Sequence, residues 1–162
     1  MRYIILSISC FFLINYSYAQ SSDYDKGLQA FDAKDFKQTL AVLKPYAEQG
    51  NCTAQFAVGF SYMYGDDIKN DSLARHWLEL AANQKQASAM GPLAVSYFMG
   101  SEKPDIVKAY MWAVLAAEYD PVQRFTTTVT LIKMYMKPAE LDAANKLISD
   151  YESKWKHTEN CK

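Results

Sequence analysis

Two short stretches of the chain, Trp77–Ala82 (WLELAA) and Trp112–Ala117 (WAVLAA), are nearly the same and lie about 35 residues apart. The same offset aligns further pairs: Ala54 with Ala89, Val58 with Leu93, Tyr62 with Tyr97, Gly65 with Gly100, and Ala74 with Ala109. A repeat of this length indicates a solenoid, because a single unit is too small to bury its own apolar face and must stack on its neighbours.

Each unit has the spacing of two helices. Apolar residues recur at steps of three and four in both halves of the unit, and a polar turn that starts at Gly65 separates them. Thr126–Thr130 is β-rich in composition, but the repeat register predicts a helix there. We therefore expect an all-α fold: a short right-handed α-solenoid of about four antiparallel helix pairs with a C-terminal capping helix.

The repeat register sets the expected boundaries. A solenoid domain over residues 20–156 divides into units at about 24–50, 51–86, 87–119 and 120–156, and a flexible tail follows over 157–162. Gly65 should end a first helix, and Asp71 should cap the second helix of the same unit. Gly91-Pro92 lies inside a predicted helix and should delay its start or bend it. The last helix should begin at Pro138 and reach about Trp155.

Residues 1–19 have the layout of a secretory signal peptide. Arg2 precedes an apolar run of about 12 residues, which is shorter than the roughly 20 that a membrane-spanning helix needs. The small-residue exit at Ser17–Ala19 predicts cleavage after Ala19. We expect a periplasmic or secreted protein with no stable membrane insertion after cleavage.

Charge and cysteine content narrow the function classes. The formal net charge is −1, which does not favour nucleic acid or an anionic membrane as a partner. Cys52 and Cys161 remain after signal cleavage, and an even pair in an exported chain could form one disulfide. Cys161 lies at the end of the chain, where Cys52 could be out of its reach, so the sequence leaves this pairing open.

The repeated residues resemble the motif of the Sel-like repeat (SLR) family, a branch of the tetratricopeptide-like solenoids. The matching positions are Ala54, Gly59, Tyr62, Gly65, Ala74, Trp77, Ala81 and Ala82, and in the next unit Ala89, Tyr97, Gly100, Ala109, Trp112, Ala116 and Ala117. The next unit departs from the motif at Ala94, where the family prefers glycine. The resemblance implies a protein-binding solenoid whose first helices line a concave face.

Helix rotation then predicts the side chains on that face. The candidate partner-binding residues are Phe31, Phe56, Phe60, Met63, Tyr64, Val95, Phe98 and Met99. Such an apolar surface is typical of a partner site, and its guest would be a helix or an extended segment of another protein. The alternative is that the chain's own helices cover these residues.

The sequence offers little for catalysis or metal binding. His76 and His157 lack metal-ligand spacing with Cys, Asp or Glu, and neither a nucleophile elbow nor a phosphate-binding glycine loop is present. We expect no enzyme activity, no cofactor and no metal. Some cysteine-rich relatives are described as binding or hydrolysing β-lactams, which keeps an enzyme as a remote alternative.

Two non-enzymatic roles follow from the resemblance. The first is a periplasmic adaptor in an envelope complex, such as a secretion or signalling system. The second is an immunity protein that neutralises a toxic effector, including effectors of type VI secretion. We favour the adaptor, because nothing in the chain looks like a dedicated inhibitory plug.

Overall fold

The chain is described by a computed structural model that covers residues 23–100, 103–119, 125–156 and 161. Within these ranges the fold is all-α, as predicted, with no β-strand. A helix over residues 23–32 comes first. It is followed by α2 (Phe36–Glu48), α3 (Cys52–Tyr64), the short 3-10 helix η1 (Asp66–Ile68), α4 (Asp71–Asn83), α5 (Ala87–Met99), α6 (Ile106–Tyr119), α7 (Thr126–Met134) and α8 (Pro138–Trp155).

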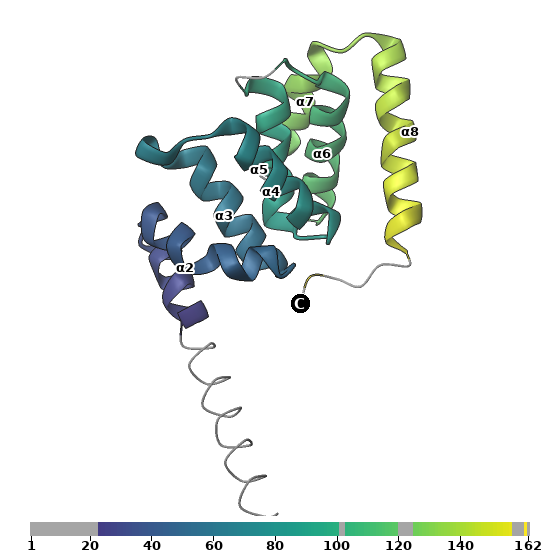
Figure 1. Cartoon of the computed structure of the whole chain (residues 1–162). Helices are drawn as coiled ribbons and strands as arrows, with labels where there is room; N and C mark the ends of the chain where they lie inside the picture. Colours follow the sequence, from purple (N-terminus) through teal and green to yellow (C-terminus); the bar gives the residue numbers. More distant parts are fainter. Residues whose placement is uncertain (1–22, 101–102, 120–124, 157–160, 162) are drawn as a thin grey trace, which may run out of the picture.

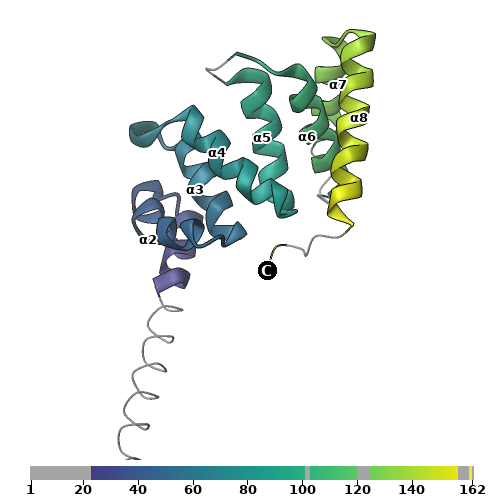
Figure 2. The same ribbon diagram turned by 45° about the vertical axis from the view of Figure 1, so that its right-hand side comes forward.

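The helices stack in sequence order, as a solenoid requires. From α2 to α7 each helix packs against the next one along the chain, and α8 packs against α6 at the far end. Figures 1 and 2 show the stack running from the N-terminal helices to α8, which lies along its outer side. Thr126–Thr130 belongs to α7. The helix predicted from the repeat register is therefore confirmed, although the composition of this stretch favours a strand.

Asparagine side chains, rather than Asp71, cap the helices of the second unit. The side chain of Asn51 accepts a hydrogen bond from the backbone N–H of Ala54 at 2.8 Å, and Asn70 accepts one from Leu73 at 3.0 Å. Asp71 is the first residue of α4, so the prediction that it caps this helix is wrong by one position. An acidic residue in the first helical turn is still favourable, because it faces the positive end of the helix dipole.

Pro92 does not delay the start of α5. The helix begins at Ala87, five residues before the proline, and continues to Met99. Near a helix start most backbone N–H groups lack an intrahelical acceptor, and the missing N–H of Pro92 removes only one bond beyond them. The expected late start is therefore wrong.

The core is built from small residues and tryptophans in two adjoining clusters. Trp77 packs with Leu43 and Val58 in the first cluster, while Leu78 of the same helix belongs to the second. Trp112 is only 2% exposed and lies in the second cluster. Helix α4 thus contributes to both clusters, which joins the units into one continuous apolar interior.

Gly59 allows α3 and α4 to approach closely. A Cβ at this position would lie 2.9 Å from Leu78 Cγ, 3.0 Å from the Leu78 backbone nitrogen and 3.1 Å from Trp77 Cβ. These separations are shorter than ordinary van der Waals contact, and one of them is to backbone that cannot rotate away. Gly59 is therefore a position where the close approach of α3 and α4 leaves no room for a side chain.

Aromatic side chains attach α8 to the end of the stack. Trp155 is 2% exposed, and its ring centroid lies 5.5 Å from Tyr119, 5.8 Å from Tyr151 and 6.3 Å from Trp112. These distances fall within the range of favourable aromatic pairs. Trp155, the last residue of α8, therefore helps to hold this helix against α6.

A disulfide joins Cys161 to Cys52, with Cα atoms 5.8 Å apart and 109 residues of sequence separation. Cys52 is the first residue of α3 and is 2% exposed. The bridge therefore links the far end of the chain to the second unit of the solenoid. In a stack where each helix contacts mainly its neighbours, this is a covalent tie between distant units.

The predicted signal peptide and most of the predicted tail lie outside the described residues. Among the residues that the structure describes, none of the helices is both long enough and apolar enough to cross a bilayer.

Candidate functional site: a groove between α3 and α5

Four of the predicted partner-binding residues line one pocket of about 370 Å³ between α3 and α5. We call this pocket the α3–α5 groove and define it by its lining residues: Phe56, Phe60, Tyr64, Ser88, Gly91, Pro92, Val95 and Phe125. None of the eight is charged. The groove is therefore an apolar hollow that α3 and α5, the first helices of successive units, form together.

Five aromatic rings from three helices cluster at the α3 side of the groove, and three of them, Phe56, Phe60 and Tyr64, line it. Phe60 lies at the centre, with its ring centroid 4.4 Å from Tyr64, 5.5 Å from Phe31, 5.7 Å from Phe56 and 6.2 Å from Phe36. Phe31 and Phe56 also meet edge to face at 5.6 Å. The rings hold one another in place, so this wall is preformed and does not need a ligand to order it.

The α5 side of the groove is shaped by a glycine. The repeat offset aligns Gly91 with Phe56, so α5 has no side chain where α3 has a phenyl ring. A Cβ at Gly91 would fall on the ring of Phe125, the residue just before α7. Phe125 thus contributes to the groove lining by packing on the backbone of α5.

A second hollow adjoins the groove where α3 and α5 end. Met63, Tyr64, Val95 and Met99 contribute to it, so it also collects four of the predicted residues and shares two with the groove. Tyr64 is 48% exposed and Met99 is 70% exposed. Large apolar side chains that remain this accessible are typical of surfaces that partners cover.

Phe31 and Phe98 lie outside the lining of both hollows. Phe31 contacts two groove residues, Phe56 and Phe60, without lining the groove itself. Phe98 is half-buried against the core, and its ring centroid lies 5.9 Å from Tyr135. Tyr135 itself is 66% exposed, and Met134 beside it is 78% exposed. Neither was predicted, because the last unit has no clear copy of the repeat motif.

Charged groups lie beside Tyr64 rather than inside the groove. Lys37 Nζ donates a hydrogen bond to Asp67 Oδ2 at 2.7 Å and joins the start of α2 to η1. This hydrogen bond lowers the pKa of the Asp67 carboxyl and raises the pKa of Lys37. Burial raises the pKa of the Tyr64 hydroxyl, which keeps this side chain neutral over the physiological range.

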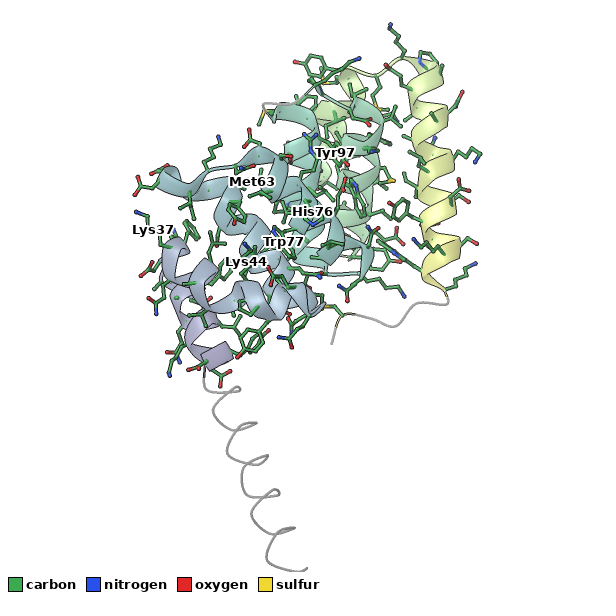
Figure 3. The ribbon with its side chains drawn as sticks, in the orientation of Figure 1. Lys37, Lys44, Met63, His76, Trp77 and Tyr97 are labelled. Carbon is green, nitrogen blue, oxygen red and sulfur yellow. A yellow bond between two sulfur atoms is a disulfide. The ribbon has the colours of Figure 1, made fainter. Side chains whose placement is uncertain are left out.

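A separate polar cluster surrounds Tyr97, a residue labelled in Figure 3 that the sequence indicated only as a repeat-motif position. Its hydroxyl donates to Glu79 and accepts a hydrogen bond from Lys108 Nζ at 3.4 Å. The Arg75 guanidinium lies 4.6 Å from the Tyr97 ring centroid and donates to the Ser96 carbonyl at 2.8 Å. These partners come from α4, α5 and α6, so the cluster links three helices.

Within the described ranges, no three His, Cys, Asp or Glu side chains gather as a metal site would need. His76 is exposed, and its ring lies 5.2 Å from the neighbouring Trp77 (Figure 3). His157 lies outside the described residues. The groove itself offers side chains for apolar contact, with one serine and one tyrosine hydroxyl as its polar groups.

Comparison with known proteins identifies the stacked units. The family model for the Sel1 repeat matches residues 53–86 and 87–118, which contain the α3–α4 and α5–α6 helix pairs. The chain is a Sel-like repeat protein. Sel-like repeats are generally non-catalytic and form protein-interaction modules, since stacked units present extended surfaces to other polypeptides. No curated protein matches this chain in sequence.

A solved structure has a similar fold. It is that of c5321, a protective antigen present in uropathogenic Escherichia coli strains that displays an SLR fold. The two chains superpose with a TM-score of 0.73 at 23% sequence identity, over 84% of this Sel-like repeat protein and 30% of c5321. This likeness concerns the fold, and the present chain spans less than a third of the length of c5321.

Proposed function

We propose that this Sel-like repeat protein is a non-enzymatic periplasmic adaptor that binds a segment of another envelope protein in the α3–α5 groove. The observation that carries the proposal is the convergence of apolar side chains from α3 and α5 on one uncharged hollow. A partner that covers such a hollow lowers the free energy of the system, because apolar surface is removed from water. The adjoining exposed Met99 extends the same apolar surface.

Two features support the compartment. The N-terminal sequence has the layout of a signal peptide, and disulfides such as Cys52–Cys161 persist in oxidising compartments but are rare in the cytosol. Cell fractionation followed by N-terminal sequencing tests this part. The expected result is a periplasmic protein that begins at Gln20, whereas a cytosolic protein that retains Met1 would contradict it.

The groove itself is tested with a pair of matched substitutions. Ser88 and Ser72 are both exposed and are the second residues of α5 and α4, but only Ser88 lines the groove. Ser88→Phe should fill the groove and remove the partner from complexes isolated from the cell envelope, while Ser72→Phe should leave them intact. Equal recovery of the same partner with both variants would rule out the groove.

The affinity for the recovered partner then separates an adaptor from an immunity protein. An adaptor can function at micromolar Kd, whereas neutralising a toxin needs nanomolar binding or tighter. Turnover of a β-lactam by the purified mature protein would contradict a non-enzymatic role altogether.

A further inference from the structure

The α3–α5 groove already holds one aromatic ring supplied from elsewhere in the chain. Phe125 precedes α7, yet its ring lies against the backbone of Gly91 on α5. On α3 the aligned position is occupied by the ring of Phe56, which belongs to that helix. The third unit therefore lacks a ring of its own at this position and receives one from a distant residue. This internal contact shows that the α5 wall accepts a phenyl ring.

The remaining space lies between aromatic and aliphatic surfaces. Phe56 and Phe60 of α3 line it, as do Pro92 and Val95 of α5, and Phe125 adds a further ring. A charged side chain would lose its hydration here without meeting an opposite charge, because the lining residues are uncharged. A ring would instead find edges and faces of other rings within reach, and aromatic pairs gain stabilisation beyond their buried area.

We propose that the partner segment inserts an aromatic side chain into this groove, between Phe60 and Val95 and against Phe125. The inference rests on the proposed function and specifies the chemistry of its partner: a polypeptide that carries a phenylalanine or tyrosine as its central anchor. Aromatic anchors in preformed pockets dominate the binding energy of many interfaces. Ser88 and Tyr64 are exposed lining residues, and their hydroxyls can form hydrogen bonds with the backbone that flanks the anchor.

The test is a nuclear magnetic resonance titration of the mature, disulfide-bonded protein with capped amino acids. The probes are N-acetyl-phenylalanine amide, N-acetyl-leucine amide and N-acetyl-lysine amide. The chain has 6 glycines, so the Gly91 amide signal falls in a sparse spectral region and can be followed together with Val95. We expect saturable shifts at these two amides, about fivefold tighter binding for the phenylalanine probe than for the leucine probe, and no saturation with the lysine probe.

Two variants then test whether the probes bind in the α3–α5 groove. Ser88→Phe should abolish the shifts, and Ser72→Phe, at the matching position of α4, should preserve them. Leucine binding that equals or exceeds phenylalanine binding overturns the inference, as do shifts centred away from Gly91 and Val95 or no saturable shift at all. These comparisons between probes use the wild-type chain and do not depend on whether a variant folds.

Failure of this inference and failure of the proposed function give different results. If Ser88→Phe removes the protein partner while the wild-type chain shows no preference for the phenylalanine probe, the groove binds a partner through another kind of side chain. If neither effect appears, the groove is not the binding site.

Discussion

Removal of the disulfide is the perturbation whose size can be worked out most fully from the structure. Cys161→Ser breaks the bridge at its accessible end and leaves the buried Cys52 as a thiol, which avoids placing a hydroxyl in the core. The bridge spans 109 residues of sequence. In the chain-entropy account, a disulfide restricts the unfolded chain. Opening a loop of this length therefore lowers the free energy of unfolding by about 4–5 kcal/mol. The melting temperature should fall on the order of 15 °C.

The assay is equilibrium urea unfolding followed by helical circular dichroism, with and without reductant. Wild-type protein in reductant should coincide with Cys161→Ser, and the variant itself should be insensitive to reductant. Because each helix packs mainly against its neighbours, hydrogen exchange should show α7 and α8 losing protection first. A loss below about 1 kcal/mol, or one spread evenly over the helices, would refute the view that the bridge ties the far end of the stack to α3.

Three further perturbations test the packing and the surface. Trp112→Ala should lower the free energy of unfolding by roughly 3–5 kcal/mol because it empties a buried site, whereas Leu73→Ala, at a position that is 39% exposed, should cost under about 1 kcal/mol in the same urea titration. Gly59→Ala should lower the free energy of unfolding by roughly 1–3 kcal/mol, because the added methyl group clashes with α4. At an open helical position the same change would raise stability slightly, so the direction of the shift in melting temperature distinguishes the two cases. Lys37→Ala should raise the pKa of the Asp67 carboxyl toward its ordinary value in a carbon-detected titration, with no measurable change in Tm. The pKa of Asp67 is lower in the folded than in the unfolded chain. Any contribution of this pair to stability is therefore present at a pH above the unfolded pKa and is lost as the pH falls through the folded pKa. A large change in stability near neutral pH would contradict this.

The repeated residues were sufficient to predict the helix pairs and much of the core. Trp77 and Trp112 recur at the repeat offset because stacked units need the same buried ring at the same place. Gly59 was informative for a similar reason, since close helix approach excludes a side chain. Periodicity reports such local and nearest-neighbour contacts well.

Contacts between positions that are distant in the sequence could not be predicted from the repeat pattern. The pairing of Cys52 with Cys161 depends on where the end of the chain lies in space, which the repeat spacing does not encode. Phe125 lies outside the clear repeats, so its packing on Gly91 could not be predicted, although a glycine aligned with Phe56 was a signal that something else fills that position.

The most direct test of the central claim is site-specific photocrosslinking in living cells. A photoreactive phenylalanine analogue is placed at Ser88 in one strain and at Ser72 in another, both as second residues of their helices. We predict a discrete adduct with one envelope protein from position 88 and none from position 72. Adducts of equal yield from both positions, or an adduct from position 72 alone, would contradict the claim that the α3–α5 groove is where this Sel-like repeat protein holds its partner.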